Sequence, residues 1–223
     1  MAPLLFIDTN IFLDFYRIEG GEAAKKQLKF IDDSHSRIIT SNQVKMEFMK
    51  HRQKVIIDTI GKIGKSGTNS GQVPPVLVDS QPHQQIKKSE KRIKYQQGKL
   101  TDRIERMLTN PTNNDKVYQC AQRLFKDNSS INLRDTTNTW IRLRGLARKR
   151  HLLGQPPRKQ SDTSIGDALN WEWIVHCAHE KTTDVLIVSR DQDFGPTYQK
   201  SAYINDWLSA EFKTRVSRKK KLR

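Results

Sequence analysis

Near the N-terminus the chain reads Leu4-Leu5-Phe6-Ile7-Asp8-Thr9-Asn10. Its first four residues form an uninterrupted apolar run, which predicts a short strand buried on both faces of a sheet. A second such run, Val185-Leu186-Ile187-Val188-Ser189, lies near the other end of the chain. Segments with helical apolar spacing, such as Gly166 to Glu180, separate the two runs. Strands that alternate with helices predict an α/β fold built on a parallel sheet.

Acidic residues follow both predicted strands. Asp8 comes directly after the first strand, and Asp191 and Asp193 follow the second. Functional residues of parallel sheets collect beyond the carboxyl ends of the strands, so we expect these acids to converge although they are far apart in sequence. Each motif taken alone also has an ordinary interpretation as a turn or a helix cap.

Two more acidic motifs lie at predicted helix starts. Ser41-Asn42-Gln43-Val44-Lys45-Met46-Glu47 places Ser41 as a cap before a helix that carries Glu47. Ser161-Asp162-Thr163-Ser164-Ile165-Gly166-Asp167-Ala168 opens the helix that precedes the last strand. Alone, Glu47 is equally well explained as a solvated helix residue, and Asp162 or Asp167 as a cap.

The charge balance indicates a polyanionic partner. The 223 residues include 40 Lys and Arg against 24 Asp and Glu, a formal net charge of +16. Such a balance favours nucleic acid, through phosphate contacts and counterion release. Acids gathered into a few motifs inside a basic chain indicate a divalent-metal site that faces a polyanion.

Other signals set the context of the chain. Cys120 and Cys177 form no Cys-x-x-Cys pair, which argues against a disulfide framework or a four-thiolate zinc site. We see neither a signal-peptide pattern nor an apolar span of about 20 residues, and therefore predict a cytoplasmic protein without a membrane partner.

The expected organisation is a single nuclease-like domain over residues 1–214, interrupted by a helical insertion at about 61–151. Glycines and prolines from Gly61 to Gln84 predict a loop at the start of this insertion. Residues 215–223 form a basic tail that we expect to be disordered.

Four features occur in a fixed order: Asp8-Thr9-Asn10 after a strand, Glu47 on a following helix, Gly166-Asp167-Ala168 opening a late helix, and Ser189-Arg190-Asp191-Gln192-Asp193-Phe194 after a late strand. This set resembles the PIN-domain ribonucleases, and most of all their bacterial PIN-like subgroup. The resemblance covers roughly residues 3–58 and 155–206. It implies an α/β/α sandwich with a central parallel sheet, into which the polar helices between these regions are inserted.

The resemblance also implies roles for individual residues. Metal ligands that are also catalytic would be Asp8, Glu47, Asp167 and Asp191, with Asp193 close by and Asp162 as an additional candidate. Asn10 and Ser189 would position the substrate. Carboxylate oxygens suit Mg²⁺ or Mn²⁺, and two such ions would activate a water and stabilise the leaving oxygen. The family implies products with a 5′-phosphate and a 3′-hydroxyl.

A basic cluster lies just before the Asp162–Asp167 motif. We predict that it contacts the substrate backbone, although a solvated helix face would have the same composition. Its members are Arg142, Arg144, Arg148, Lys149, Arg150, His151, Arg158 and Lys159. A second, weaker patch comprises Lys87, Lys88, Lys91, Arg92 and Lys94.

The leading hypothesis is a Mg²⁺- or Mn²⁺-dependent endoribonuclease that acts as a toxin or a defence effector. Such a role is compatible with a homo-oligomer and with an inhibitory or activating protein partner. The alternatives are a DNA-cleaving nuclease of the same fold and a non-catalytic nucleic-acid-binding protein. Gly64-Lys65-Ser66 does not make a phosphate loop, because Thr59 stands where the pattern needs glycine. His176 and His179 lack further zinc ligands in the sequence.

Overall fold

In the computed structural model, residues 2–17, 21–65, 73–158 and 164–223 are described. The chain divides into two compact units. We call Met1–His51 together with Cys120–Arg223 the sheet unit, and Arg52–Gln119 the helical unit. Within the described residues, no helix is long and apolar enough to cross a membrane.

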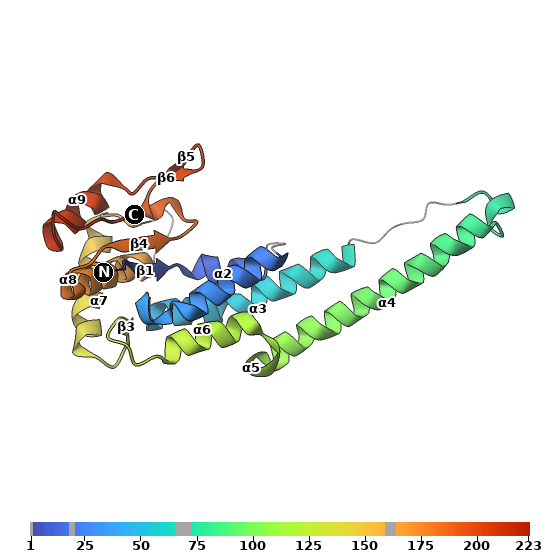
Figure 1. Cartoon of the computed structure of the whole chain (residues 1–223), viewed down its shortest axis with the longest axis horizontal. Coiled ribbons are helices and arrows are strands. Elements are labelled where there is room, and N and C mark those ends of the chain that lie inside the picture. The colour runs from blue at the N-terminus through green and yellow to red at the C-terminus, as the bar shows by residue number, and fades with distance from the viewer. Residues whose placement is uncertain (1, 18–20, 66–72, 159–163) are drawn as a thin grey trace. The chain divides into compact units, whose positions relative to one another are not determined.

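The sheet unit is built on a parallel sheet with strand order β3-β2-β1-β4. Figure 1 shows β4 beside β1 in this sheet. Its register pairs Ile7 with Val188 across β1 and β4. All residues of β1 and β2 are buried, and β1 accordingly reads as a continuous apolar run, whereas β2 ends in the buried polar residues Thr40 and Ser41. The strands are β1 Leu4–Ile7, β2 Ile38–Ser41, β3 Asn132–Leu133 and β4 Val185–Val188, and a separate antiparallel pair is formed by β5 Thr197–Tyr198 and β6 Ser201–Ala202.

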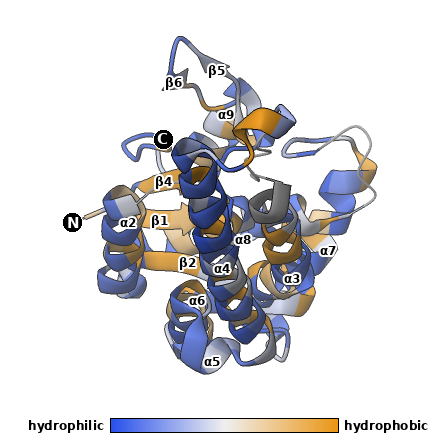
Figure 2. Ribbon diagram, turned by 90° about the vertical axis from the view of Figure 1, so that its right-hand side faces the viewer, coloured by the Kyte–Doolittle hydropathy of each residue, from blue (hydrophilic) through white to orange (hydrophobic). Residues whose placement is uncertain are grey.

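Helices cover both faces of the sheet, as the PIN-like α/β/α expectation requires. Figure 2 shows α2 on one side of β1 and β2, and α8 on the other. The indole of Trp173 on α8 donates a hydrogen bond of 2.8 Å to the carbonyl of Thr40 in β2. The helices of the sheet unit include α1 Thr9–Asp14, α2 Gly21–Asp33, α7 Asn138–Leu152, α8 Gly166–Lys181 and α9 Asp206–Arg215, with short 3₁₀ turns at η1 His35–Arg37 and η3 Gln192–Phe194.

Aromatic side chains fill the core beside α1. Phe12, Phe48 and Phe125 lie with ring centroids 6.0–6.5 Å apart, in tilted or edge-on arrangements. Phe12 and Phe48 are completely buried. Because Phe48 belongs to α3 Asn42–Lys65 and Phe125 to α6 Lys116–Lys126, this cluster fixes the sheet-unit parts of both helices against α1.

A buried charge network joins α7, α8 and α9. Glu172 of α8 accepts hydrogen bonds from Arg150 of α7 at 3.0 Å and from Arg215 of α9 at 2.7 Å. Glu211 of α9 also binds both arginines. The sequence places Arg150 in the basic cluster that we expect to contact the substrate. It is in fact a buried structural residue, because its guanidinium is enclosed by these two carboxylates.

The C-terminal residues are ordered against the sheet, so the expectation of a disordered tail is wrong for them. Backbone hydrogen bonds join Val185 to Lys221 and Arg223, each at 3.0 Å, and Ile187 to Arg223 at 2.7 Å. β4 is the last strand in the sheet order, and its outer backbone groups need partners. Backbone pairing depends little on side-chain charge, which is why the basic composition gave no sign of it.

The helical unit contains the second part of α3, α4 Gln81–Thr109, α5 Pro111–Asn114 and the start of α6, with a 3₁₀ turn at η2 Pro75–Leu77. The loop expected from Gly61 to Gln84 is shorter than predicted, because α3 continues to Lys65 and α4 begins at Gln81. Arg52 and Asp115 form a buried ion pair of 2.5 Å in this unit. Arg52 also donates to the carbonyl of Met107 at 2.6 Å.

The boundaries of the helical unit differ from the expected insertion at 61–151. β3 pairs with β2, and α7 packs on α8, so both of these elements belong to the sheet unit. The two-residue length of β3 left no recognisable strand pattern in the sequence. The single domain over 1–214 stays a prediction, within which the chain divides into the two compact units.

Removal of one partner of the buried Arg52–Asp115 pair should destabilise the helical unit. Replacing Asp115 with Ala leaves the Arg52 charge buried without its carboxylate, and we expect a loss of about 3–5 kcal/mol in the free energy of unfolding. Asp102→Ala on exposed α4 is the matched control and should change stability by less than about 0.5 kcal/mol. Urea unfolding followed by circular dichroism measures both variants. Equal midpoints for the two would contradict this role of the pair.

Candidate active site

A cavity of about 510 Å³ lies at the carboxyl ends of β1 and β4, and we call it the acid cavity. Four carboxylates from the four sequence motifs line it: Asp8, Glu47, Asp167 and Asp191. Asp8 is almost completely buried, and the other three are half-buried. The strand order places this cavity where the chain's progress across the sheet reverses, between β1 and β4, which is the usual ligand position in open α/β sheets.

The β1–β4 pairing brings Asp8 and Asp191 into one cavity. Ser189 donates a hydrogen bond of 2.6 Å to Oδ2 of Asp8, although the two residues are 181 positions apart. The amide of Asn10 donates to the same oxygen at 2.9 Å. The backbone N–H of Asp191 donates to the Ser189 hydroxyl at 3.0 Å. Ser189 therefore orients the Asp8 carboxylate and holds the start of the Asp191 loop at the same time.

Glu47 is held by two hydrogen bonds from residues outside the predicted set. Thr9 donates to Oε2 at 3.1 Å, and Gln43 donates to Oε1 at 2.6 Å. Gln43 lies one helical turn before Glu47 on α3, which is the spacing at which side chains of a helix meet. Thr9 directly follows Asp8. The motif after β1 therefore supplies one cavity acid, Asp8, and orients a second one, Glu47.

Gly166 allows α8 to begin against Glu47. A Cβ atom at this position would lie 2.5 Å from Oε1 of Glu47 and 2.8 Å from Nε2 of Gln43. Ser164 accepts a hydrogen bond of 3.1 Å from the Gly166 N–H and so fixes the approach of the chain. Glycine therefore lets the Glu47 carboxylate approach closely without a shift of its side chain, and Asp167 follows it directly into the cavity.

Basic side chains also line the acid cavity. Among the described residues, these are Arg17, Lys50, His51 and Arg190. Arg190 pairs with buried Asp14 at 2.7 Å, and its backbone N–H donates to the amide of Asn10 at 3.4 Å. Sequence reasoning missed these cations. Their only signal was position, since Lys50 and His51 follow Glu47 by about one helical turn, and Arg190 precedes Asp191.

The donor set suits a hard divalent cation bound through few protein ligands. In the part of the chain that the structure describes, no three His, Cys, Asp or Glu side chains are grouped as joint ligands of one metal ion. Mg²⁺ is usually bound through one or two carboxylates, several waters and substrate phosphates, and not by a closed protein cage. Hydrogen bonds like those on Asp8 and Glu47 are typical support for carboxylates that bind a metal. The lining of the acid cavity therefore fits such an ion.

Other predicted site residues lie elsewhere. Asp193 lies in η3, and the described lining of the acid cavity does not include it. Asp162 and Lys159 lie outside the described residues. Arg142, Arg144, Arg148, Lys149 and Arg158 are exposed and lie outside the described cavity lining.

The surroundings of His176 on α8 are not those of a zinc site. The ring of His176 stacks on Trp173 with centroids 5.3 Å apart, and Arg142 lies 3.4 Å from its Nδ1. Burial, and then the charge of Arg142, lower the pKa of His176. Burial raises the pKa of the Cys120 thiol to about 11 and that of Cys177 well above its usual value.

A parallel sheet with acids gathered at its carboxyl edge defines a nuclease-like α/β protein. A family model of the PIN domain matches residues 5–194, and the chain belongs to this family. No curated protein and no solved structure matches it. PIN domains are generally metal-dependent nucleases that act on nucleic acid, so the match agrees with the acids and with the basic charge of the chain.

The close approach at Gly166 gives a sharp test of the site. In Gly166→Ala, the added methyl group should displace Glu47 and lower the affinity for Mn²⁺, measured by calorimetry, with a loss of about 1–3 kcal/mol in stability. Gly145→Ala is the matched control, because a Cβ at that position in α7 meets nothing within 4 Å. It should keep Mn²⁺ affinity and gain up to about 1 kcal/mol in stability. Wild-type Mn²⁺ affinity in Gly166→Ala would show that Glu47 does not depend on this contact.

Proposed function

We propose that the protein is a Mg²⁺- or Mn²⁺-dependent endoribonuclease that acts in the cytoplasm as a toxin or a defence effector. The main support is the meeting of Asp8, Glu47, Asp167 and Asp191 in one cavity of a PIN domain. A protein that only binds nucleic acid would gain nothing from four carboxylates facing phosphates. We favour RNA over DNA as the proposed substrate because the motifs resemble those of the PIN ribonucleases.

Different residues of the cavity would bind the metal ions, orient a ligand and attract the phosphodiester. Asp8, Glu47, Asp167 and Asp191 would hold the ions, and bound ions would lower the pKa of a water and stabilise the leaving oxygen. Asn10 and Ser189 keep the Asp8 carboxylate in one orientation through Oδ2. Arg17, Lys50 and Arg190 supply positive charge where the phosphodiester would enter. Asp162 and Asp193 remain candidates for a further ligand, although Asp193 does not line the described cavity.

The exposed basic residues of α7 extend this positive surface. Arg150 pairs with Glu172, whereas Arg142, earlier on α7, lies beside His176, later on α8. The two helices are therefore antiparallel, and the C-terminal end of α7 points toward the α8 end that carries Asp167. Arg142 and Lys149 lie on one flank of α7 and Arg144 and Arg148 on the other, so these exposed cations form a series of two rows along the helix. We propose that this series, together with Arg158, contacts the substrate backbone.

We further propose that the helical unit selects the substrate while the sheet unit performs the cleavage. All four cavity acids belong to the sheet unit. The helical unit instead presents exposed cations on α4, namely Lys87, Lys88, Lys91, Arg92 and Lys94. Cations spread along a helix suit contacts with successive phosphates.

Metal ligation predicts the effect of removing a single acid. Asp8→Asn or Asp191→Asn should abolish cleavage with folding retained, because an amide oxygen is a weaker ligand than a carboxylate for a hard cation. Labelled tRNA, single-stranded RNA and single-stranded DNA are incubated with each protein in Mn²⁺ or in EDTA. The control is Asp135→Asn, an exposed residue outside the described cavity lining. Full cleavage by either acid variant, or by wild type in EDTA, would refute the proposal. Cleavage of DNA alone would replace RNA with DNA as the substrate.

Phosphate contacts by α7 predict a change in salt dependence. Replacing Arg144 or Arg148 with Ala should weaken binding to all sequences alike. It should also reduce the slope of log affinity against log salt by about 0.7–0.9 for each lost contact. Lys213→Ala on exposed α9 is the control and should leave the slope unchanged. Filter binding with the Asp8→Asn protein at several salt concentrations gives the slopes. Identical slopes in all variants would show that the exposed face of α7 is solvated and does not contact the substrate.

A further inference from the structure

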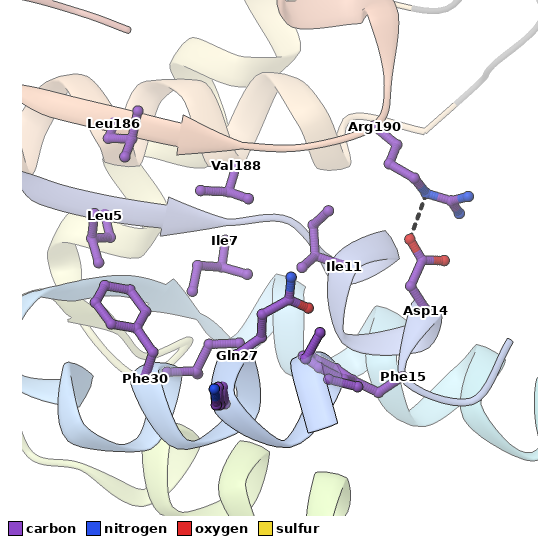
Figure 3. Close-up of a pocket in the computed structure, with 14 residues that line it drawn as sticks. Leu5, Ile7, Ile11, Asp14, Phe15, Gln27, Phe30, Leu186, Val188 and Arg190 are labelled. Atoms are coloured by element: carbon purple, nitrogen blue, oxygen red, sulfur yellow. Dashed lines mark ion pairs between the residues drawn. The ribbon is translucent and has the colours of Figure 1, made fainter. Parts of the chain in front are cut away.

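A second cavity, of about 720 Å³, lies between α2 and the sheet, and we call it the apolar pocket. Figure 3 shows Leu5 and Ile7 of β1 and Leu186 and Val188 of β4 along one wall, with Phe30 of α2 opposite. These side chains lie on one face of the sheet, because the register pairs Leu5 with Leu186 and Ile7 with Val188. The proposed chemistry of the acid cavity makes no use of this pocket.

The apolar pocket is open to solvent. Phe30 is 55% exposed, and Leu186 and Val188 are 38% and 36% exposed. A sheet face is normally covered, since apolar side chains left in water give up the free energy that their burial would provide. An apolar pocket left open beside a functional site is a candidate place for a ligand.

Arg190 joins this pocket to the acid cavity, since it lines both. Its guanidinium pairs with Asp14 at the end of the apolar pocket, at 2.7 Å (Figure 3). Its backbone N–H is bonded to Asn10, which also holds Asp8. A nucleic-acid chain with one phosphate in the acid cavity would therefore present a neighbouring nucleotide to the apolar pocket.

The lining suits a nucleobase better than a phosphate. Phe15 and Phe30 offer aromatic rings, and stacking on aromatic side chains tolerates any base. The amide of Gln27 lies near Ile7 and Ile11 in Figure 3, and it can both donate to and accept from the edge of a base. Asp14 and Arg190 are already paired with each other, which leaves little net charge at that end of the pocket.

We propose that the apolar pocket binds one unpaired base of the substrate, next to the nucleotide whose phosphate enters the acid cavity. This proposal rests on the proposed nuclease function. Phe30 contacts the face of the base, and Gln27 reads its edge. A base within a duplex stays stacked and cannot enter, so the pocket selects single-stranded or looped RNA.

The test uses the Asp8→Asn protein and short single-stranded RNAs that carry 2-aminopurine at one position each. The fluorescence of 2-aminopurine reports stacking, so one position should respond differently from its neighbours. Phe30→Ala should remove that response and weaken binding about tenfold. Gln27→Ala should change which base is preferred at that position. Trp207→Ala is the matched control, because Trp207 on α9 is also 55% exposed and should change neither result.

The outcomes separate this proposal from the nuclease function. A pocket-dependent response in a protein whose wild type cleaves nothing would support the base pocket and refute the nuclease. Cleavage by the wild type, with an unchanged cleavage pattern and unchanged RNA binding in Phe30→Ala, would overturn the base pocket and leave the nuclease standing. In that case an apolar side chain of a partner protein would become the expected occupant.

Discussion

The parallel pairing of β1 with β4 is the constraint on which the candidate site depends. It joins segments that lie 181 residues apart at Asp8 and Ser189 and aligns their carboxyl ends. Once Ile7 faces Val188, the next residues on both strands lie at the same edge, and Asp8 and Asp191 share a cavity. α3 then adds Glu47 and α8 adds Asp167 from elements packed on the same sheet. A slip of one residue in this register would turn the apolar face of β4 and move Ser189 away from Asp8.

The acidic and basic side chains of the protein lie in three kinds of environment: the acid cavity, buried ion pairs and the exposed surface. The acids at the carboxyl edge face a cavity that is also lined by Arg17 and Arg190, so a polyanion that enters it would meet cations as well as carboxylates. Elsewhere in the sheet unit, the charges of Arg150 and Arg215 are neutralised by ion pairs with Glu172 and Glu211. The net charge of +16 is thus carried mainly by exposed side chains, where it attracts phosphates over a distance set by salt.

The strands and their acids could be predicted from sequence because each signal is local. A buried strand reads as an apolar run, and the acids after Ile7 and Val188 follow from chain direction alone. The family resemblance added Glu47 and Asp167. The supporting contacts could not be predicted, because Thr9 meets Glu47 and Gly166 makes room for it only in three dimensions. β3 is too short to leave a pattern, and Gly61 wrongly suggested the end of α3 because a single glycine costs a helix only about 1 kcal/mol.

The buried network of Arg150, Glu172, Glu211 and Arg215 has a consequence for how this sequence can evolve. Each carboxylate binds both arginines, so one neutral substitution leaves a charge without its counterpart in the interior. Replacing the network as a whole by apolar residues need not be costly, because buried ion pairs often contribute little net stability. The four positions are therefore expected to drift together across relatives, as charged sets or as apolar sets, with mixed sets rare. Relatives that carry the same set of residues should also keep the same relative placement of α7, α8 and α9.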